Sequence, residues 1–167
     1  MNLVRCIPDF PKPGIMFRDI TTALKSPVGL RLAVDAMADA LEGLDFDLVV
    51  GPESRGFIFG TPLAYRLGKG FVPARKAGKL PAAVIGREYD LEYGTAVIEM
   101  HEDAIAPGQR VVLVDDLLAT GGTAKAVAEL VAGMGAEVVG MVFLIELEGL
   151  KGRDLLEGYN VQSVLGY

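Results

Sequence analysis

The segment 111–124, "VVLVDDLLATGGTA", sets four aliphatic residues before two adjacent aspartates and a Thr-Gly-Gly-Thr turn. An uninterrupted aliphatic run of this kind is typical of a strand that is buried on both faces of a parallel sheet. Residues 123–134 then carry apolar side chains at helical spacing, and Gly135 stands where a glycine commonly ends a helix. The segment therefore predicts a strand over 109–115, a tight turn and a helix over 123–134.

The same alternation of strand and helix is expected along the rest of the chain. Ser26 and Pro27 suit the N-cap and first position of a helix, and another helix is expected from about Gly56 to Leu67. Further strands are expected at four runs of apolar residues, 47–51, 70–75, 95–100 and 138–147. The pattern predicts an α/β fold with a doubly wound, mainly parallel sheet flanked by helices, in one domain over residues 1–167.

Composition narrows the class of protein. The formal net charge of -6 disfavours a general nucleic-acid binder, because such proteins neutralise phosphates with a positive surface. No run of 18 uncharged apolar residues occurs, and the first residues lack the apolar core of a signal peptide, so no membrane partner and a cytoplasmic location are expected. Cys6 and His101 are each alone, which excludes an internal disulfide or a Cys/His zinc cluster within one chain.

The turn after the aspartates has the features of an anion site. Gly121 and Gly122 let the backbone turn sharply, so that successive N–H groups and the positive end of the following helix point at one place. Asp115 and Asp116 would repel a phosphate, so they are better suited to accept hydrogen bonds from sugar hydroxyls or to contact a metal that the ligand carries. A phosphorylated ribose fits both features, although a plain turn with solvated aspartates remains an alternative on these residues alone.

Five segments together resemble the type I phosphoribosyltransferase family, and in particular its purine-using members. The residues "VVLVDDLLATGGT" resemble the family's signature for phosphoribosyl pyrophosphate. The other segments follow in the family's order: "DFPKPGIMFRDIT" (9–21), "GPESRGFIFG" (51–60), "RKAGKLP" (75–81) and "YDLEYGTAVIEMHEDAI" (89–105). The residues of these segments are most similar to those of adenine-using members. The resemblance implies transfer of 5-phosphoribose from phosphoribosyl pyrophosphate to adenine, which yields AMP and pyrophosphate.

The resemblance also implies a small N-terminal hood over residues 1–24 and a flexible catalytic loop over about 76–93. Basic residues after two strand ends suit the pyrophosphate, because charge-assisted hydrogen bonds from Arg and Lys favour phosphate oxygens. A cis peptide bond is expected between Glu53 and Ser54. The residues expected to bind the donor or AMP are Glu53, Ser54, Arg55, Arg75, Lys76, Lys79, Tyr93, Asp115, Asp116, Ala119, Thr120, Gly121, Gly122 and Thr123.

Magnesium is expected as the cofactor, carried into the site by the donor, because the sequence shows no metal-binding cluster of its own. The reaction needs a general base for the ring proton of adenine. Relatives that use oxopurines have an acid where this sequence has Ala119, so the resemblance assigns the base to Glu92 in the "DLEYG" segment. A loop that closes over the site would exclude water from the reactive sugar carbon.

Adenine is expected between the hood and the end of the strand 138–147. The resemblance places the backbone around Met16, Phe17 and Arg18 against the edge of the purine and Leu147 against its face. Glu146 stands near the position of a lysine in oxopurine relatives, and an ionised carboxylate cannot donate to a carbonyl oxygen, which favours an aminopurine. A homodimer is implied, with the 75–79 region able to reach the neighbour's site. A phosphoribosyltransferase for another purine and a nucleotide-sensing regulator of the same fold remain alternatives.

Overall fold

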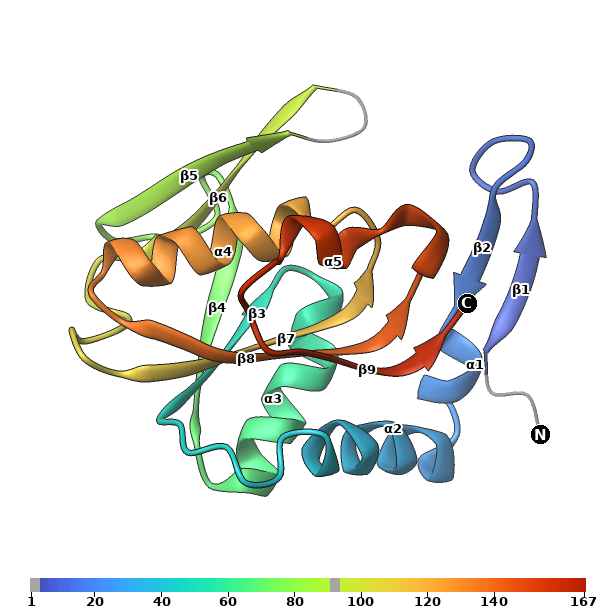
Figure 1. Ribbon diagram of the computed structural model, residues 1–167, viewed down its shortest axis with the longest axis horizontal. Helices are drawn as coiled ribbons and strands as arrows, with labels where there is room; N and C mark the ends of the chain where they lie inside the picture. The colour runs from blue at the N-terminus through green and yellow to red at the C-terminus, as the bar shows by residue number, and fades with distance from the viewer. Residues whose placement is uncertain (1–3, 91–93) are drawn as a thin grey trace.

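In the computed structural model, which describes residues 4–90 and 94–167, seven strands form one central sheet in the order β5-β6-β4-β3-β7-β8-β9 (Figure 1). The strands β3, β4, β7, β8 and β9 are parallel, and the β5–β6 hairpin adds antiparallel pairs at one edge. Their bounds are β3 Leu48–Pro52, β4 Gly70–Lys76, β5 Val84–Asp90, β6 Thr95–His101, β7 Arg110–Leu118, β8 Glu137–Glu146 and β9 Val161–Gly166. The predicted α/β fold with a mainly parallel sheet is confirmed.

Helices cover both faces of this sheet (Figure 1). On one face lie α2 (Pro27–Asp39) and α3 (Arg55–Leu67), and on the other lies α4 (Gly122–Gly133). Along β7, Val112 and Val114 pack in the cluster with α2 and α3, whereas Val111 and Leu113 pack in the cluster with α4. Side chains alternate between the faces of a strand, so an uninterrupted aliphatic run is what burial on both faces requires.

The helix starts and ends agree with their sequence signals. Ser26 caps α2, since its Oγ accepts a hydrogen bond from the Gly29 N–H at 3.2 Å, and Pro27 is the first helical residue. Gly135 follows α4 with a φ of 76°, the left-handed conformation expected of a glycine past a helix end. The short helices α1 (Thr21–Leu24) and α5 (Gly152–Leu155) and the 3-10 helix η1 (Glu148–Leu150) complete the described helices, and none of those is long and apolar enough to cross a membrane.

Two expectations about the sheet are corrected. The strand expected to end at Asp115 continues to Leu118, because β7 stays paired with β8 as far as the Leu118–Glu146 pair. Its pairing with β3 ends at Val50–Leu113, so the two aspartates lie where one edge of β7 has lost its neighbour. The segment 76–93, expected to be a loop, contains β5, which pairs with β6 from Val84–His101 to Asp90–Thr95. The C-terminal strand β9 was not predicted.

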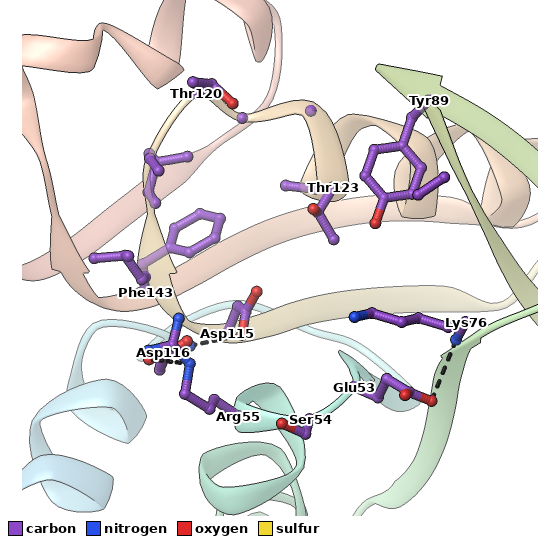
Figure 2. A pocket seen from close by; sticks show the side chains of 17 residues that line it. Glu53, Ser54, Arg55, Lys76, Tyr89, Asp115, Asp116, Thr120, Thr123 and Phe143 are labelled. Carbon is purple, nitrogen blue, oxygen red and sulfur yellow. Dashed lines mark hydrogen bonds and ion pairs between the residues drawn. The ribbon is translucent and has the colours of Figure 1, made fainter. Parts of the chain in front are cut away.

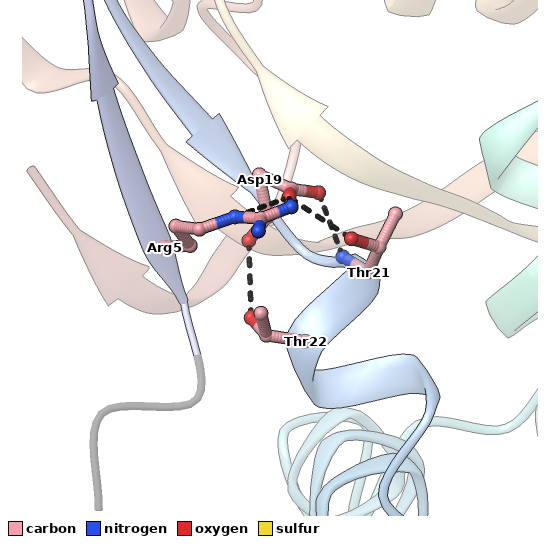
Figure 3. Close-up of polar contacts among 4 residues, drawn as sticks. All are labelled: Arg5, Asp19, Thr21 and Thr22. Carbon is pink, nitrogen blue, oxygen red and sulfur yellow. Dashed lines mark hydrogen bonds and ion pairs between the residues drawn. The ribbon is translucent and has the colours of Figure 1, made fainter.

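The expected N-terminal hood is a two-stranded antiparallel ribbon, β1 (Arg5–Pro8) and β2 (Met16–Asp19), separate from the main sheet (Figure 1). Its base is fixed by the Asp19 carboxylate, which accepts hydrogen bonds from the Thr21 N–H and Oγ1, both at 2.9 Å, and forms an ion pair with Arg5 (Figure 3). The Thr21 N–H bond and then the Arg5 bond lower the pKa of Asp19 to about 2. The carboxylate therefore stays ionised at neutral pH and ties β2 to both β1 and α1.

Candidate active site

A cavity of about 390 Å³ lies at the carboxyl ends of β3 and β7 (Figure 2). The chain leaves β3 through α3 on one face of the sheet and leaves β7 through α4 on the other. Ligand sites of doubly wound sheets form at such a switch point, where the two connections part. The predicted residues that line the cavity are Glu53, Ser54, Arg55, Lys76, Asp115, Asp116, Ala119, Thr120, Gly121, Gly122 and Thr123.

The two aspartates form the floor of this cavity beside Arg55. Asp115 Oδ1 accepts a hydrogen bond from the Asp116 N–H at 2.8 Å, and Asp116 Oδ2 lies 3.1 Å from Arg55 Nε. Burial raises the pKa of Asp115 well above its usual range, and the neighbouring Asp116 charge raises it further. Burial also raises the pKa of Asp116, while the Arg55 guanidinium partly offsets this. Hydroxyl donors or a cation entering the cavity would stabilise the ionised pair.

The glycine turn supplies the opposite wall of the cavity. Gly121 has a φ of 86° and is the N-cap of α4, whose first helical bond runs from the Lys125 N–H to the Gly121 carbonyl at 2.9 Å. A Cβ atom at Gly121 would stand 2.6 Å from the Gly152 carbonyl oxygen, so only glycine fits this position. The N–H groups of the first turn have no acceptor inside the helix, and with the helix dipole they favour an anion.

The segment after β3 approaches β7 closely. The peptide bond between Glu53 and Ser54 is cis, as the resemblance led us to expect. A Cβ atom at Gly56, in the first turn of α3, would stand 2.9 Å from the Val114 carbonyl oxygen and 3.1 Å from Asp115 Oδ1. The glycine thus lets the start of α3 lie directly against the aspartate pair, which brings Ser54 and Arg55 into the cavity.

The expected basic residues divide into two groups. Lys76 extends from the end of β4 into the cavity (Figure 2), while its N–H donates to Glu53 Oε2 at 3.2 Å. Arg75 lies outside the lining, where its Nε donates to Glu53 Oε2 at 2.9 Å and its Nη1 donates to the Lys79 carbonyl at 3.0 Å. Lys79 is also outside the lining. Within one chain, Arg55 and Lys76 are therefore the predicted cations that face the cavity.

The residues expected to bind adenine lie apart from this cavity. Met16, Phe17 and Arg18 belong to the hood, and Leu147 follows β8, where its N–H donates to the Leu118 carbonyl at 2.9 Å. Glu146, used above to favour an aminopurine, binds Arg153 through both carboxylate oxygens at 2.7 Å. These bonds lower the pKa of Glu146, so the side chain is an ionised partner of Arg153.

Two expected residues cannot be compared with the structure. Glu92, the expected general base, and Tyr93, expected to bind the donor, lie outside the described residues. They fall between the ends of β5 and β6, next to the strand that carries Tyr89 into the cavity. Within residues 4–90 and 94–167, no three His, Cys, Asp or Glu side chains gather into a group that could hold a metal ion.

Sequence reasoning missed several residues that line the cavity. Tyr89 from β5 lies near Thr123 at the start of α4, and Phe143 from β8 lies beside the aspartates (Figure 2). Phe143 is the register partner of Asp115, so its place depends on a strand pairing that no local pattern encodes. Tyr89 lies in the segment 76–93, which the sequence predicts to be a loop. The other unpredicted lining residues are Ala96, Leu117, Leu118 and Ala124.

The chain belongs to the phosphoribosyl transferase family, whose domain model matches residues 24–164. The cavity agrees with this class, because it sets an amide-lined turn against a buried pair of acids at the switch point of the sheet.

Individual relatives narrow the class to one kind of transferase. The chain is 61% identical to the adenine phosphoribosyltransferase of Agathobacter rectalis over 99% of this chain and 95% of that protein. It is similar to the crystal structure of adenine phosphoribosyltransferase from Thermoanaerobacter pseudethanolicus, with a TM-score of 0.96 and 55% identity over 99% of this chain and 96% of that one. The Saccharomyces cerevisiae enzyme, solved with an imino-altritol bisphosphate and adenine, has a TM-score of 0.91 and 40% identity over 97% and 94% of the two chains.

Proposed function

We propose that this chain transfers the 5-phosphoribosyl group from phosphoribosyl pyrophosphate to adenine and releases AMP and pyrophosphate. The observation that carries the proposal is the cavity in which the amide turn at 121–124 faces Asp115 and Asp116. Relatives that match nearly the whole chain are adenine phosphoribosyltransferases, which supports adenine over another purine and an enzyme over a regulator.

The residues that line the cavity favour one orientation of phosphoribosyl pyrophosphate. Its 5-phosphate accepts hydrogen bonds from the N–H groups at the start of α4, where the helix dipole adds positive potential. The ribose hydroxyls donate to Asp115 and Asp116, whose burial makes such partners favourable. The pyrophosphate then lies toward Arg55 and Lys76, the cations that line the far side. Where the donor carries magnesium, Asp115 and Asp116 would contact the ion, which would offset the negative charge of the leaving pyrophosphate.

This arrangement separates the charges that the reaction develops. As the bond to pyrophosphate breaks, the ribose ring becomes positive and the leaving group becomes more negative. Arg55 and Lys76 stabilise the leaving group, while the nearby carboxylates stabilise the sugar. The Asp116 carboxylate also fixes the Arg55 guanidinium through the 3.1 Å ion pair, so the guanidinium needs little reorganisation during the reaction.

Adenine is assigned to the space between the hood and the end of β8. The main chain at Met16, Phe17 and Arg18 would contact the purine edge, and Leu147 would pack against its face. Glu92 would accept the ring proton of adenine as the bond to ribose forms. A protein that uses a reactive sugar must exclude water from the reacting carbon. Glu92 follows β5 in the sequence, and Tyr89 of that strand lines the cavity.

The enzyme is proposed to act as a homodimer in the cytoplasm. The outer sides of α2 and α3 expose large apolar side chains: Val28 54%, Leu32 53%, Ile58 38% and Tyr65 89%. Large apolar side chains that are exposed on two neighbouring helices favour a protein contact surface here. Arg75 and Lys79 do not line their own chain's cavity and would then serve the neighbouring site, for which Arg75 would exchange its bond to Glu53 for one to the ligand.

The proposed reaction is tested by supplying one nucleobase at a time. Purified protein, phosphoribosyl pyrophosphate and magnesium should form nucleotide from adenine, and not from guanine, hypoxanthine or xanthine, as measured by chromatography of the products. The Glu92→Gln variant should lose about 100-fold or more of kcat, because it can no longer accept the proton. Nucleotide formation from an oxopurine alone would refute the assignment of the substrate, and near-normal turnover of Glu92→Gln would refute that of the base.

A further inference from the structure

A contact joins the hood to Tyr167, the residue that follows β9. The Arg18 guanidinium carbon lies 4.1 Å from the centroid of the Tyr167 ring, a cation–π contact. The Arg18 Nη1 also donates to the Sγ of Cys6, its register partner on β1, at 2.6 Å. The Arg18 side chain therefore joins both strands of the hood to Tyr167. In Figure 1 the C-terminus accordingly lies beside β2.

Tyr167 is at the same time fixed around Leu147. Its N–H donates to the Glu146 carbonyl and its carbonyl accepts from the Glu148 N–H, both at 2.9 Å. These two bonds bracket Leu147 on either side. Tyr167 cannot shift relative to Leu147 without breaking at least one of them.

Further contacts keep β9 at the side of β8. The ladder between the two strands continues to the pair Glu146–Gly166. In addition, the Glu146 carboxylate binds Arg153 through two bonds at 2.7 Å and accepts from Ser163 Oγ at 2.6 Å. These contacts hold the end of β9, and with it the backbone of Tyr167, at the side of β8.

We propose that Tyr167 is a positioning residue for the nucleobase, which sets the spacing between Arg18 in the hood and Leu147 at the end of β8. This inference rests on the proposed function, since that function places adenine between these two residues. Without the ring, the hood keeps its anchor at Asp19 but loses the cation–π contact with Tyr167, which is bonded to the residues on either side of Leu147. The purine would then enter a slot whose two walls are no longer held at a fixed distance.

The donor site should not be affected by this contact. None of Arg18, Leu147 and Tyr167 lines the cavity assigned to phosphoribosyl pyrophosphate. A positioning role for the nucleobase therefore predicts a change in the KM for adenine with little change in the KM for the donor. A general loosening of the fold would instead raise both constants.

Steady-state kinetics of Tyr167→Leu test the proposal, with Tyr167→Phe as the matched control. The Leu variant keeps the main-chain bonds and loses the aromatic face, so the KM for adenine should rise about two- to fivefold, the range for a cation–π contact at an exposed site. The KM for the donor and the unfolding temperature should stay unchanged. Tyr167→Phe keeps the ring face and should behave as wild type.

A double-mutant cycle with Arg18→Met separates this route from other effects of the substitution. If Tyr167 acts through Arg18, then Tyr167→Leu should not raise the KM for adenine further in the Arg18→Met background. An unchanged KM for adenine in Tyr167→Leu, or an equal rise for the donor, would overturn the inference while the proposed function stands. Wild-type protein that forms no AMP from adenine would overturn both.

Discussion

Two adjacent carboxyl groups, of the buried Asp116 and the partly buried Asp115, lie at the floor of the cavity, where Arg55 forms an ion pair with Asp116. Their raised pKa values mean that the ionised forms are less stable in the fold than in water. The empty protein therefore carries an energetic cost that a donor with hydroxyl groups and magnesium would relieve. Natural sites accept such costs because the same groups bind the ligand.

The substitution Asp115→Asn should stabilise the ligand-free protein and impair the reaction. Asn keeps an oxygen that can accept from the Asp116 N–H and removes the buried charge, so the unfolding temperature at pH 7.5 should rise by about 2–4 °C per kcal/mol of relieved cost. The folded pKa is raised, so the cost appears as pH rises above the unfolded value of about 3.9. The gain should accordingly shrink as pH is lowered toward that value.

Calorimetry across pH and steady-state kinetics check both parts of this prediction. The kcat/KM for the donor should fall about 10- to 100-fold, as expected when a hydrogen bond to a charged group is lost. A variant that is less stable than wild type at pH 7.5 would contradict the assigned cost of burial.

The acids and the glycine turn could be predicted from the sequence because they are contiguous and belong to one strand, turn and helix. Phe143 could not, because it reaches the cavity through its register with Asp115 in a different strand. Arg75 was placed with the cavity cations because it follows a strand end, but its guanidinium turns to Glu53 and the Lys79 carbonyl. Local sequence specifies which strand end a residue follows, and tertiary contacts decide where its side chain points.

Among the elements, the hood depends on a small number of polar contacts at its base. Asp19 joins β1, β2 and α1, and its pKa of about 2 is below the ordinary value of about 3.9. A lowered folded pKa contributes stability that is present above the unfolded value and is lost as pH falls through the folded one. The window for this loss therefore runs from about pH 4 down to about pH 2.

The Asp19→Asn variant should be less stable than wild type at pH 7, and the difference should narrow between about pH 4 and pH 2. Urea unfolding at a series of pH values measures this through the midpoint concentrations. Asp103→Asn, at an exposed aspartate after β6, is the matched control for the change of residue type. A difference in stability that stays constant from pH 7 to pH 2 would show that the Asp19 charge is not responsible.

At the same scale, sequence patterns predicted the strands of the central sheet better than those at its edges. The central strands carry long aliphatic runs because both of their faces are buried. In contrast, β9 contains only partly buried and exposed residues, and β5 joins only the edge of the sheet. Edge strands bury less surface, so their sequences carry a weaker signal.

At the scale of the whole molecule, the exposed apolar residues of α2 and α3 predict the assembly state. Leu32→Lys should convert a dimer to a monomer, because it places a charge on the exposed face of α2 that also carries Val28, four residues earlier. Light scattering after size-exclusion chromatography measures the mass. Ala132→Lys, an equal change at an exposed position of α4 on the opposite face of the sheet, should leave the dimer intact. A dimer that persists in Leu32→Lys would place the interface elsewhere.

Because β7 is buried on both faces of the sheet, few amino-acid substitutions near it would leave the activity of the enzyme unchanged. Because Val111 and Leu113 pack with one helical layer and Val112 and Val114 with the other, the strand that carries the aspartates belongs to both halves of the core. A core substitution on either side of the sheet can therefore shift the carboxylates and lower catalytic efficiency. We expect surviving variants from random mutagenesis to collect on the hood and on the outer helix faces, with few in this strand.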